Sequence, residues 1–168
     1  MADFRTCFSF VLPNEDFTPP RYEAVPDPTE SDPAAQAISG INSAFWAADF
    51  AAIVALPQNQ RGAAVAAFYE RNFWSSWLQQ LNSNKVAAMV LDADINEGRK
   101  EGTEFLQMAC GVEADGKFGP MTLTAANALP PAVIVPAFIE ARQARYREIG
   151  GPNLAQWLER AARVPAFD

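Results

Sequence analysis

The sequence predicts an all-α protein with about seven helices and one irregular segment near the N-terminus. From residue 61 onward, apolar residues recur at spacings of three and four, as on the buried face of a helix. No segment alternates apolar and polar residues over the length of a strand, and no internal repeat or heptad run is present. Five prolines fall within residues 16–37 and interrupt no periodic segment. These observations favour helices packed on helices, with room for a small β patch in residues 16–41.

The N-terminal third is expected to hold a short helix, an irregular segment and a second helix. Residues 3–12 place apolar side chains at i, i+3, i+4 and i+7, and Pro13 is expected to end this helix. Residues 16–37 combine their prolines with few aliphatic side chains, which is typical of an irregular surface segment. Ser43 can cap a helix over residues 44–56, which Pro57 would stop.

Helical periodicity continues through the rest of the chain. The predicted helices span residues 62–81, 85–97, 100–110, 121–128, 132–149 and 154–163. Breaks are expected at residues 127–131 and at Gly150-Gly151-Pro152. We expect two lobes packed as one compact unit, the first over residues 1–82 and the second over residues 83–168.

A glycine-rich connector precedes the helix at residues 121–128. It reads Gly111-Val-Glu-Ala-Asp-Gly-Lys-Phe-Gly-Pro-Met-Thr122. Asp115-Gly116 predicts a turn, because glycine accepts a positive φ without steric cost, and Pro120 suits the first turn of the following helix. A single Asp-Gly is an ordinary helix connector, whereas the full string is much rarer.

Composition and charge exclude several classes of function. Apolar residues make up 49% and charged residues 20%, which is typical of a soluble globular protein, and no apolar run is long enough to span a membrane. The net charge of −7 disfavours a nucleic-acid partner, because phosphate binding depends on clustered lysine and arginine. Asp3 and Arg5 interrupt the N-terminus, so we expect no signal peptide.

The titratable residues restrict the chemistry further. The chain has no histidine, which removes Ser-His-Asp, Cys-His and histidine-ligated zinc chemistry and leaves carboxylates as the acid–base groups. Cys7 and Cys110 can pair only if the fold brings them together, and they lack the further ligands of a metal site. We therefore expect neither a metal nor a cofactor.

Candidate catalytic carboxylates gather after the first helix. Glu15 lies at the edge of the proline-rich segment, where partial burial against Phe10 or Phe17 would favour the protonated carboxyl that a general acid needs. Further carboxylates follow within the same segment: Asp16, Glu23, Asp27, Glu30 and Asp32. A glycosidase uses two carboxylates, or one carboxylic acid with a positioned water, and a solvated acidic loop is the alternative interpretation. Asp32 and Asp27 are the candidates for the second group.

Candidate ligand-binding residues lie further along the chain. Asp92 and Asn96 are four residues apart and share one helix face, which either binds ligand or caps a neighbouring helix. Tyr69 and Trp74 supply aromatic rings for stacking on sugars, although most aromatic residues of the chain are expected in the core.

Several of these segments, taken in order, resemble glycoside hydrolase family 108. They are Asn14-Glu15, Asp32-Pro33, Gly40-Ile41, Tyr69 with Phe73-Trp74, Val90-Leu-Asp92 with Asn96 and Gly98, Leu106-Gln107, residues 111–122, Ala141-Arg142, Tyr146-Arg147 and Trp157-Leu158. The resemblance covers residues 3–163. It implies a lysozyme-like fold, an N-acetylmuramidase activity on peptidoglycan, and a C-terminal part predicted to bind peptidoglycan. By position, Glu15 matches the general acid of the family's Glu-Gly-Gly-Tyr motif.

The chain departs from the family pattern around that acid. Asp16, Phe17 and Thr18 replace Gly-Gly-Tyr, and Ala37 stands where the family has a threonine that helps to hold the attacking water. An alanine methyl cannot accept a hydrogen bond, and Ser39 could substitute only if the loop is rearranged. The interval between Glu15 and Asp32 is also longer than the family pattern.

Two hypotheses of function follow from the resemblance. The first is a muramidase that cleaves the β-1,4 bond between N-acetylmuramic acid and N-acetylglucosamine, with Glu15 as general acid. The second is an impaired homologue that binds peptidoglycan or serves as a structural component of a phage tail or secretion device. Either would be made in the cytoplasm and reach the periplasm or cell wall through a holin, a secretion machine or a phage particle. A purely intracellular helical adaptor is a third hypothesis.

Overall fold

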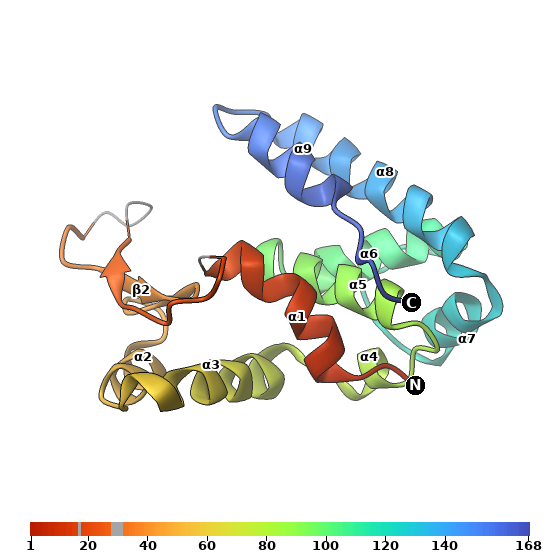
Figure 1. Cartoon of the computed structure of the whole chain (residues 1–168). Coiled ribbons are helices and arrows are strands. Elements are labelled where there is room, and N and C mark those ends of the chain that lie inside the picture. Colours follow the sequence, from red (N-terminus) through yellow and green to blue (C-terminus); the bar gives the residue numbers. More distant parts are fainter. Residues whose placement is uncertain (17, 28–31) are drawn as a thin grey trace. The chain divides into compact units, whose positions relative to one another are not determined.

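The computed structural model describes residues 1–16, 18–27 and 32–168, so Phe17 and Glu30 lie outside the described residues. Within those residues the chain forms nine helices and three short strands, which confirms an all-α fold with a small β patch. The helices are α1 (Phe4–Glu15), α2 (Ala47–Val54), α3 (Gln58–Phe73), α4 (Ser76–Gln79), α5 (Asn84–Asn96), α6 (Arg99–Cys110), α7 (Pro120–Ala128), α8 (Pro131–Ile149) and α9 (Leu154–Ala162). The strands are β1 (Val25–Pro26), β2 (Gln36–Ile38) and β3 (Ile41–Asn42), and Figure 1 shows the order of the elements.

The chain divides into two compact units. The hairpin unit comprises Phe8–Asn72, and the helical unit comprises Met1–Cys7 together with Phe73–Asp168. Helix α1 therefore begins in the helical unit and ends in the hairpin unit, and α3 ends at the boundary. Each unit has its own set of buried apolar side chains.

The hairpin unit contains a small antiparallel sheet in the order β1-β2-β3. Ala37 pairs with Val25 on one side and with Asn42 on the other, and Ile38 pairs with Ile41 across the β2–β3 turn. Helix α2 contacts both β2 and β3, and Figure 1 shows it below β2. The fully buried apolar side chains of this unit include Val11, Ile38, Ile41 and Val65. The sheet is too small to stand alone, so helices must support it.

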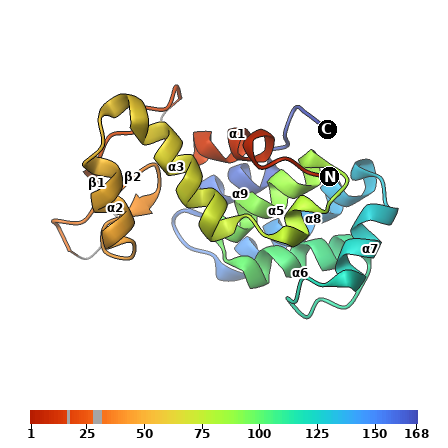
Figure 2. The ribbon, with the colours of Figure 1, turned by 90° about the horizontal axis from the view of Figure 1, so that it is seen from below.

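The helical unit is organised around α5. Every residue of this helix from Val86 to Asp94 is buried, because α5 lies against α4, α6 and α8. A helix that is covered on all sides is apolar on all sides, and α5 accordingly lacks a strong polar face before Asp92. Helix α8 also contacts α6 and α9, and α7 contacts α6; Figure 2 shows these helices from below.

Two serines explain where helix boundaries differ from the predicted ones. The helix predicted over residues 62–81 is interrupted, because Ser75 is extended and its side chain accepts a hydrogen bond from the backbone N–H of Leu78 at 3.2 Å, which begins α4. The prediction that Ser43 caps a helix is wrong. Its hydroxyl oxygen accepts from Gln36 N–H at 2.9 Å and prolongs the hairpin, and α2 begins only at Ala47.

The prediction that Pro13 ends the first helix is also wrong. Proline removes only its own N–H donor, and the N–H of Asp16 still donates to the carbonyl of Leu12 at 2.9 Å. Helix α1 therefore continues through Pro13 and ends at Glu15. The consequence is that the candidate general acid is the last residue of a helix.

The glycine-rich connector forms the turn that its sequence predicts. Gly111 is left-handed at the end of α6, and Pro120 is the first residue of α7. The amide of Gln107 holds the turn, since its Nε2 donates to Asp115 Oδ1 at 2.7 Å and to Thr122 Oγ1 at 3.1 Å. Its Oε1 accepts from Gly116 N–H at 2.9 Å. The connector is thus a self-contained hydrogen-bonded link between α6 and α7.

Candidate active site

A cleft with a cavity volume of about 360 Å³ lies in the hairpin unit. The end of α1, the segment around β1 and the β2–β3 turn contribute its walls. Its lining residues are Asn14, Glu15, Asp16, Glu23, Val25, Pro26, Asp27, Ala37, Ser39 and Gly40. Four of them are carboxylic acids, set beside a short apolar wall. A concave site with a few convergent polar groups is the usual form of a small-ligand or substrate site.

Glu15 lines the cleft and is half-buried. Gly40, in the β2–β3 turn, lies directly against it, because a Cβ added at Gly40 would stand 2.4 Å from Glu15 Oε2. Gly40 also has a φ of +75°, which residues with a side chain rarely adopt. Glycine at position 40 is therefore required twice, once for the turn and once for the carboxyl beside it.

Asp16 also lines the cleft and connects three segments of backbone. Its Oδ1 accepts from the N–H of Arg21 at 3.1 Å, and its Oδ2 accepts from the N–H of Tyr22 at 3.1 Å. The hydroxyl of Ser39 donates to the same Oδ2 at 2.5 Å. Asp16 thus ties the chain after α1 to the β2–β3 turn, which is a role that its sequence position does not reveal.

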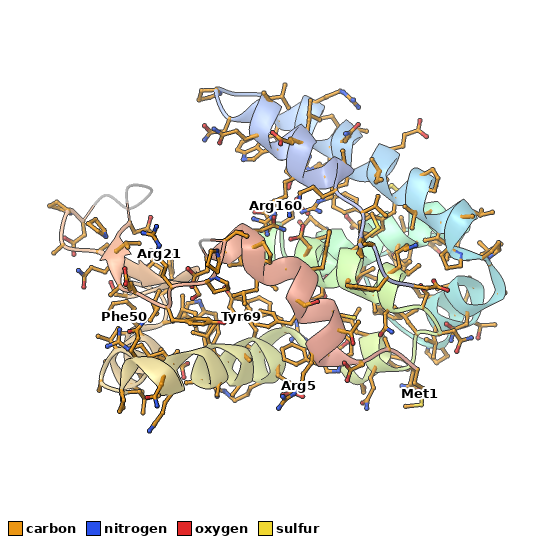
Figure 3. All side chains as sticks on the ribbon, in the orientation of Figure 1. Met1, Arg5, Arg21, Phe50, Tyr69 and Arg160 are labelled. Carbon is orange, nitrogen blue, oxygen red and sulfur yellow. The ribbon has the colours of Figure 1, made fainter. Side chains whose placement is uncertain are left out.

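Tyr69 supports this turn from α3. Its hydroxyl donates to the backbone carbonyl of Ser39 at 2.7 Å, and its ring packs against Phe8 with a centroid distance of 5.0 Å. Tyr69 is labelled in Figure 3 and is only 2% exposed. The side chain predicted to stack on substrate is therefore buried behind the turn, where it holds Ser39 in place.

The other two predicted carboxylates have different positions. Asp27 lines the cleft, and its Oδ2 accepts from Asn42 Nδ2 at 2.6 Å. Asp32 is exposed, accepts from Ala34 N–H at 2.8 Å and is not among the residues that line the cleft. Of the two candidates for the second group, Asp27 is the one that lines the cleft together with Glu15. Glu23 also lines the cleft, and in the sequence only its place in the acidic segment indicates a role for it.

Ala37 and Ser39 lie two residues apart and both line the cleft. Ile38 between them is completely buried, as expected where side chains alternate between the two faces of a strand. The methyl group of Ala37 brings no hydrogen bond to this wall, whereas Ser39 brings a hydroxyl. The wall therefore carries a hydroxyl group two residues after Ala37.

Asp92 belongs to the helical unit and is buried, with 1% of its side chain exposed. Its Oδ2 accepts from Arg142 Nη1 at 2.7 Å, and its Oδ1 accepts from Arg160 Nη2 at 2.9 Å; Arg160 is labelled in Figure 3. Burial alone raises the pKa of Asp92, but the charges of Arg160 and Arg142 outweigh it, so the pKa lies below its ordinary value. The geometry is that of a structural ion-pair network linking α5, α8 and α9, and it leaves no exposed carboxylate for a ligand.

Asn96 and Trp74, the two remaining predicted residues, also lie in the helical unit. Asn96 is exposed, and its Nδ2 donates to Tyr146 Oη at 2.5 Å. It lines a second cavity of about 280 Å³ with Glu97, Glu101, Arg145, Tyr146, Ile149 and Trp157. Trp74 is half-buried and packs edge-on against Phe4 at 5.7 Å. Asn96 thus remains open to a ligand, and Trp74 has a packing role.

The two cysteines and the acidic side chains are the groups of this chain that could bind a metal ion. Cys7 and Cys110 are both unpaired, and burial raises the pKa of Cys7 to about 12 and that of Cys110 to about 11. In the described part of the chain, no group of three or more cysteine, aspartate or glutamate side chains is arranged to hold a metal ion. Nor is any described helix long and apolar enough to cross a membrane.

Comparison with known proteins establishes the fold. No protein-family model matches the chain, and no curated protein matches its sequence. The solved structure of SagA from Brucella abortus is similar, with a TM-score of 0.63 and 22% sequence identity. The match covers 95% of this chain and 95% of that chain. At this level of identity the likeness concerns the fold.

Proposed function

We propose that this chain acts on peptidoglycan as an N-acetylmuramidase of the kind found in glycoside hydrolase family 108, with Glu15 as the general acid. The observation that carries the proposal is the position of Glu15 at the end of α1, in a cleft and against the glycine turn at Gly40. A carboxyl group held at a cleft wall can protonate the oxygen of a glycosidic bond bound there.

The rest of the cleft suits a sugar in an oxocarbenium-like transition state. Asp27 provides a second carboxylate in the same cleft, and its negative charge would stabilise the positive charge that develops on the sugar ring. Val25 and Pro26 provide an apolar wall for the faces of sugar rings. In this proposal Asp32 takes no part in the reaction, since it is not among the residues that line the cleft.

The position of Ala37 supports a second candidate function. The residue lines the cleft at the place where the family pattern has its water-holding threonine, and it offers no hydrogen bond. A chain that binds peptidoglycan without cleaving it would retain the cleft and the helical unit and lose turnover. Such a protein would serve as a wall-binding component of a phage tail or a secretion device.

Release of reducing ends from purified peptidoglycan sacculi distinguishes the two functions. We expect the wild-type chain to release reducing ends and Glu15→Gln to release them about 10²–10⁴-fold more slowly, because the amide cannot donate a proton to the leaving oxygen. Glu70→Gln is the matched control, since Glu70 is an exposed glutamate of the same unit and does not line the cleft.

The possible results distinguish the muramidase function from the binding function. If the wild-type chain and Glu15→Gln release the same background while Glu70→Gln does not differ from either, the muramidase function is wrong. Sedimentation of the same proteins with sacculi then tests the second candidate. Co-sedimentation without turnover supports a binding component, and absence of both contradicts a role on the wall.

A further inference from the structure

Ser39 and Asp16 form a hydrogen-bonded pair on the wall of the cleft that holds Glu15. The hydroxyl of Ser39 donates to Asp16 Oδ2 at 2.5 Å, and both side chains line the cleft with Glu15. The two residues are 23 positions apart in the sequence and meet only because the β2–β3 turn lies against the end of α1. Neither residue has a part in the acid chemistry assigned to Glu15.

The backbone of Ser39 has an uncommon conformation and is held by a hydrogen bond from α3. Ser39 has a φ of +47°, an uncommon conformation for a residue with a side chain. The hydroxyl of Tyr69 donates to its carbonyl oxygen at 2.7 Å, and the side chain is buried. These contacts hold the backbone of Ser39 in place, and its hydroxyl donates to Asp16.

The direction of this hydrogen bond determines what the hydroxyl can do. A serine hydroxyl has one proton to donate and two lone pairs that accept. Since the proton is given to Asp16, the lone pairs of Oγ are the part that can receive a proton from a water molecule in the cleft. A negatively charged acceptor strengthens such a bond and polarises the hydroxyl toward it.

We propose that Ser39 and Asp16 form the base of the reaction, with Ser39 Oγ holding the attacking water and Asp16 taking the proton through it. This inference rests on the proposed muramidase function. As the bond between the anomeric carbon and the bridging oxygen breaks, Glu15 gives its proton to that oxygen. The water oxygen bonds to the anomeric carbon, its proton passes to Ser39 Oγ, and the hydroxyl proton of Ser39 passes to Asp16 Oδ2. Transfer of a proton from Asp16 to solvent and from solvent to Glu15 restores both groups.

The Ser39–Asp16 pair thus supplies the hydroxyl group that Ala37 lacks. Ala37 and Ser39 both line the cleft wall, and the hydroxyl group is therefore two residues further along the chain, where it donates to the carboxylate of Asp16. Because water attacks the anomeric carbon directly in this scheme, the product has the inverted configuration. An enzyme that used a carboxylate of the cleft as a nucleophile would retain it.

The test measures the hydrolysis of uncrosslinked peptidoglycan strands by four variants. Ser39→Ala removes the hydroxyl, and Ser39→Gly removes it while relieving the positive φ. Asp16→Asn removes the proton acceptor. Ser43→Ala is the matched control, because Ser43 is a hairpin serine that does not line the cleft.

We expect both Ser39 variants to lose about 100-fold in kcat with little change in KM, because the lost water is needed in the transition state rather than for binding. Ser43→Ala is expected to keep the wild-type rate. Asp16→Asn is expected to lose rate and also the acidic limb of the pH profile of kcat/KM, which a purely structural role of Asp16 would leave in place. Proton NMR of the first products is expected to show inversion, and thermal melting monitors the fold of each variant.

The failures of this inference and of the proposed function are distinguishable. A wild-type chain no faster than Glu15→Gln contradicts the muramidase function and this inference with it. An active wild-type chain for which folded Ser39→Ala matches Ser43→Ala overturns the role of the pair alone. Retention of configuration, or an unchanged pH profile in folded Asp16→Asn, overturns it as well.

Discussion

Gly40 is the residue on which the position of the candidate acid depends. The carboxyl of Glu15 occupies the space that a side chain at residue 40 would fill, and the Tyr69 hydroxyl lies 2.7 Å from the same point. The sequence shows a glycine before Ile41, but it does not show that a helix end lies against it. Only the meeting of two segments 25 residues apart makes this glycine necessary, as the positions of Glu15 and Gly40 show.

The first prediction concerns Gly40→Ala. The new methyl group collides with Glu15 Oε2 and Tyr69 Oη, and the flexible end of Glu15 is the part that can move. We expect hydrolysis of sacculi to fall at least 100-fold, while the free energy of unfolding falls by only about 1–2 kcal/mol for the left-handed backbone. Gly111→Ala is the control, since Gly111 has a φ of +70° and no atom within 4 Å of the added Cβ. Equal activity in the two variants would contradict the role given to Gly40.

The second prediction concerns Asp94, a buried carboxyl that lies outside the cleft. Its Oδ1 has no hydrogen-bond partner among the described residues. Burial raises the pKa of Asp94 well above its ordinary value; Arg99 lowers it in part, and Glu97 raises it further. The folded chain therefore keeps a proton on Asp94 at a pH where the unfolded chain has lost it.

The sign of the pH dependence follows from this difference. As pH rises above the unfolded pKa, stability falls by about 1.4 kcal/mol for each pH unit until the folded pKa is reached. Asp94→Asn carries no such titration, so we expect it to gain stability relative to the wild type between pH 4 and pH 7. Urea unfolding of both proteins across this range measures the effect. Parallel pH profiles would show that Asp94 is ionised in the folded chain.

At the scale of elements, the contact between α5 and α6 depends on Gly102. A Cβ at this position would stand 2.2 Å from Asp94 Oδ1 and 3.1 Å from the backbone nitrogen of Asp94. The two helices therefore approach closely at a point where one of them has no side chain. In the sequence, Gly102 is a glycine within a predicted helix, which by propensity alone only weakens the helix.

The third prediction reverses the usual effect of replacing a helical glycine. Gly102→Ala should gain about 1 kcal/mol from helix propensity, but we expect a net loss of about 1–3 kcal/mol because the methyl group overpacks the interface with α5. Urea unfolding measures the loss. In the double variant with Asp94→Ala, most of it should be recovered, since the carboxyl that causes the collision is gone. A loss that is simply additive would contradict this explanation.

Helix existence was easier to predict than helix boundaries. The long periodic segments of α5, α6 and α8 are helices as predicted. An apolar stripe at helical spacing is stabilised by burial against other helices, and each of the three packs against the others. Ser43 and Ser75 are both good caps in isolation, yet only Ser75 caps a helix. The hydroxyl of Ser43 instead accepts a hydrogen bond from Gln36 across the hairpin. Local propensity does not predict this contact between residues seven positions apart.

At the scale of the whole molecule, the net charge of −7 affects any encounter with a cell wall. Peptidoglycan sacculi that carry anionic polymers repel a negatively charged protein at long range, and salt screens this repulsion. Charge thus opposes the first encounter with the wall.

The fourth prediction follows from this screening. Co-sedimentation of Glu15→Gln with anionic sacculi should strengthen as sodium chloride rises from 10 to 150 mM, a range over which the screening length falls from about 30 to about 8 Å. Binding to chitin, which is uncharged, is the control and should change little. Weaker binding to sacculi at higher salt would mean that a local cationic surface, rather than the net charge, governs the encounter.

As with the fold, some features of the candidate site could be predicted from the sequence and others needed the structure. The sequence predicts Glu15 as the acid from its place at the edge of the proline-rich segment and from the family motif, whereas the cleft around it is made by residues as far along the chain as Gly40. The sequence raises Asp16, Ser39 and Gly40 as candidates, but it does not show the hydrogen bonds and close approaches between α1 and the β2–β3 turn that give them their roles. For Asp92 the sequence leaves ligand binding and a structural role open, and for Tyr69 it suggests stacking on a sugar; the burial of both side chains comes from packing that polarity alone does not predict.

Sequence information was sufficient for what depends on neighbours along the chain: the helical class, the glycine-rich turn before α7, the absence of histidine chemistry and the candidate acid. Those features follow from periodicity, backbone preference and residue inventory, which act over a few residues. The three-dimensional arrangement decided which carboxylates share a cleft, which hydroxyl lines that cleft and which polar residues are buried. Such relations join residues that are distant in sequence, and only the packing of the elements brings them within hydrogen-bonding distance.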